Sequence, residues 1–164
     1  MQWKFRMSLA GLAVLVLASQ SRADSSDTRG HSGSACRPVR AENAALFSTL
    51  GRIQHRGGAP EDVVCPVVRE RLHAPEAPLD VSITVQSSAG SRLTCTFYSL
   101  SSTGNLIGAF SKSTYSAFPT ALFLNVPPGY VGFGGSQYIR CTLPPGGSLL
   151  NYYAGESAER GGDR

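Results

Sequence analysis

Cysteine is the residue type in this chain best able to do chemistry, and four are present: Cys36, Cys65, Cys95 and Cys141. Consecutive cysteines lie 29, 30 and 46 positions apart, so no C-x-x-C pair exists and neither thioredoxin-like redox chemistry nor zinc-ribbon ligation is indicated. Cys65 stands in the apolar run V-V-C-P-V-V, whereas a reactive thiolate needs an electropositive, partly exposed setting. The four cysteines are therefore expected to form structural disulfides.

The alternation of apolar residues favours one of the three pairings that four cysteines allow. Cys95 in L-T-C-T-F and Cys141 in I-R-C-T-L each share the apolar face of an expected strand. Two inward-pointing cysteines on separate strands can be joined through the core of a sandwich. We therefore predict the pair Cys95–Cys141, which leaves Cys36–Cys65 by elimination.

No other pattern predicts a catalytic residue, a metal site or a cofactor. The sequence contains no H-E-x-x-H, G-x-S-x-G, P-loop or dinucleotide-binding motif. The histidines, His31, His55 and His73, have no partner at metal-ligand spacing, and we expect them to be solvated. Carboxylates are too sparse for the dense oxygen set that calcium requires. The chain is therefore predicted to be non-enzymatic.

One segment, G-Y-V-G-F-G-G-S-Q-Y at positions 129–138, suggests binding. Its aromatic residues, Tyr130, Phe133 and Tyr138, offer flat amphipathic faces that can stack on sugars or anchor a partner. The structural alternative, which we favour, places Phe133 in the core and uses the glycines for a bulge or a wide hairpin. That alternative predicts Tyr130 and Tyr138 buried or dispersed, whereas a shared exposed groove would support binding.

Apolar and polar residues alternate with a period of two along much of the chain, which predicts β-strands. The residues above are therefore expected to be positioned by strands. The clearest hairpin pairs residues 79–87 with 91–100, and Pro66 is expected to place its strand at an edge or a bulge. Residues 41–55 fit a short helix or a strand. The pattern predicts an all-β fold, an antiparallel β-sandwich of about seven strands with two disulfides, with an up-and-down barrel as the alternative. The expected strands are residues 62–68, 79–87, 91–100, 106–111, 121–126, 138–143 and 148–153.

The N-terminal segment reads as a secretion signal. A basic start containing Lys4 and Arg6 precedes the apolar run Met7–Ala18, which is too short to span a bilayer, and small residues at Ser21 and Ala23 fit a cleavage site. The protein is therefore expected to be secreted or periplasmic, where thiols can pair. The expected organisation is a signal peptide at 1–23, a flexible leader at 24–35, a β-sandwich domain at 36–154 and a flexible tail at 155–164.

The charge balance gives no sign of a polyanionic partner. The chain has 15 Lys and Arg residues against 11 Asp and Glu, and loss of three basic residues with the signal would leave a net charge of 12 − 11 = +1. The arginines are scattered and form no basic block, so neither nucleic acid nor an anionic membrane is an expected partner. No second apolar run follows the signal, so the mature chain is expected to have no membrane span.

Three motifs together resemble a loose group of small secreted bacterial proteins of unknown function: V-V-C-P-V-V-R at 63–69, L-T-C-T-F-Y-S at 93–99 and Y-I-R-C-T-L-P-P-G at 138–146. The resemblance covers residues 36–153 and implies a disulfide-bonded β-sandwich, but no activity.

These observations lead to a ranked set of functional hypotheses. The first is a secreted, non-enzymatic interaction or structural module whose partner is an unknown extracellular protein or glycan. The alternative is a carbohydrate- or small-ligand-binding domain that uses the aromatic segment at 129–138. The third is a small extracytoplasmic hydrolase with an unrecognised site.

Overall fold

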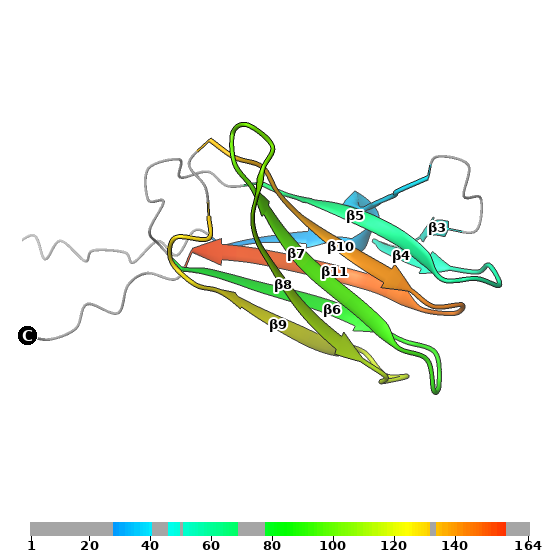
Figure 1. The fold of residues 1–164 in the computed structure, drawn as a ribbon. Coiled ribbons are helices and arrows are strands. Elements are labelled where there is room, and N and C mark those ends of the chain that lie inside the picture. The colour runs from blue at the N-terminus through cyan, green and yellow to red at the C-terminus, as the bar shows by residue number, and fades with distance from the viewer. Residues whose placement is uncertain (1–27, 41–45, 50, 69–77, 132–133, 157–164) are drawn as a thin grey trace, which may run out of the picture.

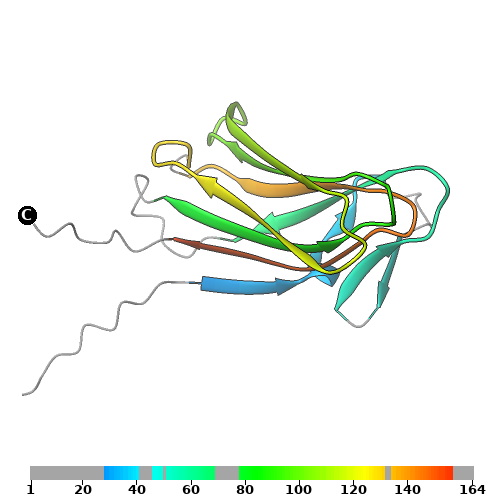
Figure 2. The same ribbon diagram turned by 90° about the horizontal axis from the view of Figure 1, so that it is seen from below.

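Two antiparallel β-sheets lie face to face in the computed structural model (Figures 1 and 2), which confirms the predicted β-sandwich and not the barrel alternative. The structure describes residues 28–40, 46–49, 51–68, 78–131 and 134–156. Its elements are the strands β1 (Thr28–Ser32), β2 (Arg37–Pro38), β3 (Leu46–Thr49), β4 (Arg52–His55), β5 (Glu61–Val67), β6 (Leu79–Gln86), β7 (Leu93–Leu100), β8 (Leu106–Thr114), β9 (Thr120–Val126), β10 (Gln137–Leu143) and β11 (Ser148–Glu156), and the short 3-10 helix η1 (Gly33–Ala35).

Strand order defines the two sheets. In sheet A the order is β3-β4-β11-β6-β9, and β1 also pairs with β11; in sheet B the order is β2-β5-β10-β7-β8. The long strands correspond to those expected from the sequence, and the strands beyond the expected seven are mainly the short β1, β2, β3 and β4. Among the described residues, no helix has the length and apolar character needed to cross a bilayer.

The core forms between the inner faces of the sheets, because alternate residues of each long strand point inward. Burial along β6 and β7 switches at every residue, as the period-two pattern predicts. Each fully buried aliphatic or aromatic side chain contributes about 1.5–3 kcal/mol relative to exposure. The largest fully buried side chains include Tyr152, Phe97, Leu79, Ile83, Leu93, Leu124, Ile139, Leu143 and Leu149.

The predicted hairpin between residues 79–87 and 91–100 is wrong. β6 pairs with β11 and β9 in sheet A, whereas β7 pairs with β10 and β8 in sheet B, so the chain crosses from one layer to the other at Ser87–Ser91. Alternation requires each strand to bury one face. Strands that face each other across a core satisfy that requirement as well as strands that pair side by side.

Residues 46–49 and 52–55, in the segment left open between helix and strand, pair as the antiparallel strands β3 and β4. Gly51, between the two strands, has a φ of 80°, in the left-handed region that glycine adopts without strain. Residues 41–45 lie outside the described residues.

The predicted flexible leader at 24–35 is wrong over its described part. β1 pairs with β11 from Thr28 opposite Gly155 to Ser32 opposite Asn151, and η1 follows it directly. The pairing arises because β11 presents an open edge beyond its short contact with β4. The folded part of the chain therefore includes Thr28, and β11 carries it to Glu156 at the other end, two residues past the expected boundary. The predicted signal at 1–23 and residues 157–164 of the tail lie outside the described part.

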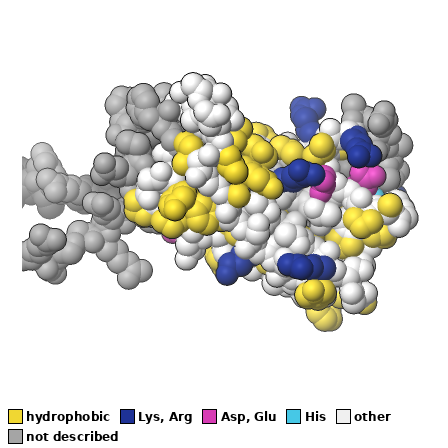
Figure 3. Space-filling model, viewed as in Figure 1, with side chains coloured by type: hydrophobic (Ala, Val, Ile, Leu, Met, Phe, Trp, Pro, Cys, Tyr) yellow, Lys and Arg dark blue, Asp and Glu magenta, His cyan; other side chains and the backbone are white. Residues whose placement is uncertain are grey.

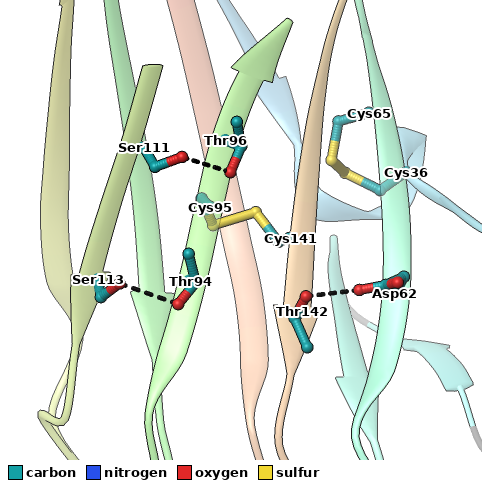
Figure 4. The surroundings of a disulfide bond; sticks show 10 residues. All are labelled: Cys36, Asp62, Cys65, Thr94, Cys95, Thr96, Ser111, Ser113, Cys141 and Thr142. Atoms are coloured by element: carbon teal, nitrogen blue, oxygen red, sulfur yellow. Dashed lines mark hydrogen bonds between the residues drawn. A yellow bond between two sulfur atoms is a disulfide. The ribbon is translucent and has the colours of Figure 1, made fainter. Parts of the chain in front are cut away.

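Both disulfides lie within sheet B (Figure 4). The bonds are Cys36–Cys65 and Cys95–Cys141, the pairing that the alternation favours. Cys95 lies directly opposite Cys141 in the β7–β10 register, with 4.1 Å between their Cα atoms. The bond lies on the core side of sheet B, but it joins neighbouring strands of that sheet and does not cross between the two layers as expected. The first bond continues the β2–β5 register in the same way.

Pro66 does not place β5 at the edge of the sheet. β5 is the second strand of sheet B and pairs with β10 over its full length, while the two-residue β2 covers only Val63 and Val64 on its other side. Pro66 lies beyond that short pairing, where its missing N–H removes no ladder bond to β2.

Candidate functional site

The outer face of sheet B carries the side chains with binding chemistry. Because Cys95, Phe97, Ile139 and Cys141 point into the core, the residues between them on β7 and β10 point outward. The antiparallel register then sets these outward residues in rows across the sheet. Sheet B faces the viewer in Figure 1, and Figure 3 shows the same face in space-filling form.

Tyr98 and Tyr138 form a stacked pair in one of these rows. They are directly opposite in the β7–β10 register, their ring centroids are 5.0 Å apart and the ring planes differ by 17°. The neighbours in the row are Pro66 beside Tyr138 and Ala109 beside Tyr98, both exposed. Each ring uses one face on the other, and the next residue along the row on either side is small or flat. The row is therefore an aromatic surface that a planar or ring-shaped ligand can contact.

Hydroxyl groups occupy the two rows that follow toward the start of β7. Thr96 and Ser111 are joined by a hydrogen bond of 2.8 Å between their hydroxyl oxygens, and Thr94 and Ser113 by one of 2.9 Å (Figure 4). A hydroxyl both donates and accepts, so each keeps hydrogen-bonding capacity for a ligand. On the other half of the sheet, the Thr142 hydroxyl donates to Asp62 Oδ1 at 2.5 Å.

An ion pair between Asp62 and Arg140 lies at the middle of the face. Arg140 is on β10, the central strand of sheet B, and its Nη2 donates to Asp62 Oδ2. Burial on its own would raise the pKa of Asp62, but the hydrogen bonds from Arg140 and Thr142 and the charges of Arg140 and Arg40 outweigh it and lower that pKa below the usual 3.8. The hydrogen bond and charge of Asp62 raise the pKa of Arg140 in turn. Both groups are therefore charged at neutral pH.

The predicted binding residues do not form one site. Tyr138 belongs to the stacked pair, whereas Tyr130 lies over Gly108 and packs edge-on against Phe110, with ring centroids 5.3 Å apart. Gly108 and Phe110 sit opposite the inward residues Ser99 and Phe97, so Tyr130 covers the inner side of β8 while Tyr138 is on the outer face. Phe133 lies outside the described residues. The two tyrosines are thus dispersed, as the structural alternative predicts.

Tyr98 is the residue that the sequence analysis missed. Its signal was its place on the polar face of the strand, between Thr96 and Leu100, opposite the cysteine face. That signal identifies an outward residue but gives it no partner until the strand register is known.

The histidines do not gather into a reactive centre. His55 is fully buried in β4 and is not solvated as expected. Its backbone N–H donates to the Gly147 carbonyl at 2.9 Å, which ties β4 to the turn at 144–147. His31 stacks on Tyr152 with ring centroids 5.0 Å apart, and His73 lies outside the described residues. Within the described part of the chain, no cluster of histidine, cysteine and carboxylate side chains could hold a metal ion.

Comparisons with known proteins bear on the fold and show no family for this chain. A scan against protein-family models and a search of curated proteins both give no match. Among solved structures, the chain is similar to a xylan-binding module, CBM15, with a TM-score of 0.50 and 10% identity over 82% of this chain and 99% of that one.

Two other structures resemble the chain less closely. One is the CBM36-1 domain of a multidomain xylanase from the hindgut metagenome of Trinervitermes trinervoides, with a TM-score of 0.49 and 12% identity over 80% of this chain and 98% of that one. The other is the CBM22-2 xylan-binding domain from Paenibacillus barcinonensis, with a TM-score of 0.47 and 10% identity over 78% and 95%.

Proposed function

We propose that the protein is a carbohydrate-binding domain that holds a glycan chain on the outer face of sheet B. The observation that carries the proposal is the tyrosine pair, Tyr98 and Tyr138, stacked on an open sheet face beside rows of hydroxyl groups. Aromatic faces carry partial negative charge and attract the C–H groups that line one side of a sugar ring. The likeness of the fold to a xylan-binding module supports this reading over a protein-interaction module.

The second element of the proposal is the polar half of the face. Sugar hydroxyls need both hydrogen-bond donors and acceptors, and hydroxyl groups, which act as both, are supplied by Thr94, Thr96 and Thr142. Arg140 adds charged donors and Asp62 a charged acceptor. A chain lying across the face would contact the tyrosine pair with one sugar and these groups with its neighbours. The two disulfides fit work in an oxidising compartment, outside the cytosol.

The test measures polysaccharide binding by wild-type protein and by single-alanine variants. Affinity gel electrophoresis against soluble neutral and acidic polysaccharides identifies ligands, and calorimetry gives the dissociation constants. We expect Tyr98→Ala and Tyr138→Ala each to weaken binding about tenfold, equivalent to about 1.4 kcal/mol. Phe123→Ala is the matched control, because Phe123 is 64% exposed but lies on the outer face of sheet A.

Two results would refute the proposal. One is the absence of binding to every polysaccharide by folded wild-type protein. The other is an equal loss of affinity in Phe123→Ala and Tyr98→Ala, since that would place the ligand elsewhere. Thermal unfolding of each variant shows that the fold is kept.

A further inference from the structure

Arginines that are scattered in the sequence gather on the outer face of sheet B. Arg37 on β2 lies opposite Val64 on β5, which lies opposite Arg140 on β10, so the two arginines share one row with a single valine between them. Both arginines are exposed. A third, Arg92, donates from Nε to the Ser113 hydroxyl at 3.1 Å, at the same end of the face.

The acidic groups on this face are fewer than the basic ones. Asp62 is the one carboxylate among the described outward residues of β5, β10 and β7, and it already pairs with Arg140 and is close enough to Arg40 for that charge to lower its pKa. Three arginines, Arg37, Arg92 and Arg140, therefore face one carboxylate in these rows. In Figure 3, the half of this face toward the start of β7 carries most of the basic side chains with two acidic patches beside them, and the other half carries the largest hydrophobic patch.

Asp62 orients Arg140 without using all of its donors. A guanidinium has five N–H groups in a fixed fork, and the ion pair is made through Nη2. The Arg140 side chain is 47% exposed, so a ligand can reach it while the ion pair is kept. A carboxylate fits such a fork, as a phosphate does, because it accepts two parallel N–H···O bonds.

The tyrosine pair adjoins this arginine row. Tyr138 and Arg140 are two residues apart on the same face of β10, which places their Cα atoms about 6–7 Å apart. Tyr98 and Thr96 repeat that spacing on β7. A sugar ring stacked on the pair would thus hold a carboxylate substituent, its own or that of the next sugar, within reach of Arg140.

We propose that the glycan bound by this face is an acidic polysaccharide, in which uronate carboxylates bind Arg140 and Arg37 while sugar rings stack on Tyr98 and Tyr138. This inference rests on the proposed function and narrows it to one class of ligand. A neutral polysaccharide would leave the excess positive charge of the face unmatched, whereas an acidic one complements it.

The test compares each acidic polymer with its own neutral form. Polygalacturonate, alginate and glucuronoxylan are each assayed beside the carboxyl-reduced polymer, which keeps the linkages and replaces each carboxylate with a hydroxymethyl group. We expect at least one acidic polymer to bind tenfold or more tightly than its reduced form. That preference should shrink as salt rises from 50 to 500 mM, because the arginines are exposed to solvent.

Variants assign the preference to the arginine row. Arg37→Gln should reduce the ratio of acidic to neutral affinity at least threefold, and the double change Asp62→Asn with Arg140→Gln, which removes the ion pair without leaving a lone charge, should reduce it further. Lys112→Gln is the matched control: it removes the same charge, but Lys112 lies opposite Cys95 and so points to the other side of sheet B. Tyr98→Ala should weaken binding of both polymer forms and leave the ratio unchanged.

The outcomes separate the inference from the proposed function. Equal or tighter binding of the reduced polymers by wild-type protein would overturn the acidic ligand and leave a glycan-binding protein. Binding of polystyrene sulfonate as tightly as any uronate polymer, unaffected by Tyr98→Ala, would overturn it too, because the face would then be a simple cation patch. Failure of every acidic and neutral polymer to bind would refute the proposed function itself.

Discussion

The phenol of Tyr152 in sheet A donates a hydrogen bond of 2.7 Å to the carbonyl oxygen of Pro66 in sheet B. Tyr152 is fully buried, so the bond crosses the core between the two layers. Pro66 lies directly beside Tyr138 in the β5–β10 register. The core contact therefore anchors the backbone that flanks the tyrosine pair on the outer face.

Replacing Tyr152 with phenylalanine removes this cross-layer bond and keeps the ring. The Pro66 carbonyl then loses its donor, so we expect Tyr152→Phe to lower the free energy of unfolding by about 0.5–1.5 kcal/mol. Urea unfolding at pH 7 measures the change. Tyr153→Phe is the control, because the alternation points Tyr153 away from the core. A similar loss in both variants would contradict the role given to the bond.

The same phenol predicts how stability falls in alkali. Burial raises the pKa of Tyr152 from 10.0 to about 12, because the phenolate is poorly solvated in the core. A raised folded-state pKa means that the contribution of this group is complete below pH 10 and is lost as the pH rises toward about 12. Phenolate absorbance near 295 nm should therefore show one late step that Tyr152→Phe lacks. Early ionisation of all tyrosines in folded protein would refute this prediction.

Asp62 predicts the opposite dependence in acid. Its pKa is lowered in the folded state, so its contribution is present above its usual pKa of 3.8 and disappears as the pH falls through the lowered value. The pair with Arg140 is partly exposed, and we expect Asp62→Asn to cost up to about 1 kcal/mol at pH 7. Unfolding free energies of the two proteins at pH 7, 5, 3 and 2 should converge only below pH 4. A constant difference at every pH would rule out the charge as the cause.

The disulfides allow a prediction about both stability and register. Removing Cys95–Cys141 as a pair of alanines should cost roughly 2–4 kcal/mol, and removing Cys36–Cys65 slightly less because its loop is shorter. Denaturant unfolding of the two double variants measures both costs. Peptide mapping of the unreduced protein checks the pairing, and a Cys36–Cys95 or Cys65–Cys95 link would contradict the structure.

The Cys95–Cys141 bond also shows how much of the candidate site could be predicted from the sequence. Alternation alone favoured the two cysteines as partners. If they lie directly opposite on antiparallel neighbours, counting three residues along each strand places Tyr98 opposite Tyr138, and counting one places Thr96 opposite Arg140, as observed. The expectation of a bond between layers hid this consequence, because a bond across the core fixes no strand register.

Other features depended on contacts that a local pattern does not contain. The alternation of residues 79–86 and 93–100 is the same whether the strands pair side by side or face each other, so the layer change between them was not predictable. Arg37 and Arg140 are more than 100 positions apart and meet in one row only through β5. The polar segment T-R-G-H-S has little strand character of its own and becomes β1 because the edge of β11 is open to it.

Gly33 provides a test of whether this N-terminal segment belongs to the fold. A Cβ at this position would lie 2.2 Å from the Leu149 carbonyl oxygen and 3.0 Å from that of Leu150, whereas a Cβ at Gly30 in the neighbouring β1 would have no atom within 4 Å. The backbone of β11 cannot retreat without breaking its pairing with β6.

We therefore expect Gly33→Ala to lower the free energy of unfolding by about 1–3 kcal/mol, the range for overpacking. Gly30→Ala should change it by less than about 0.5 kcal/mol. Thermal and urea unfolding of the two variants, measured in parallel, compare their free energies of unfolding. If the segment were a flexible leader, an added methyl group would meet nothing at either glycine and the two variants would be equally stable.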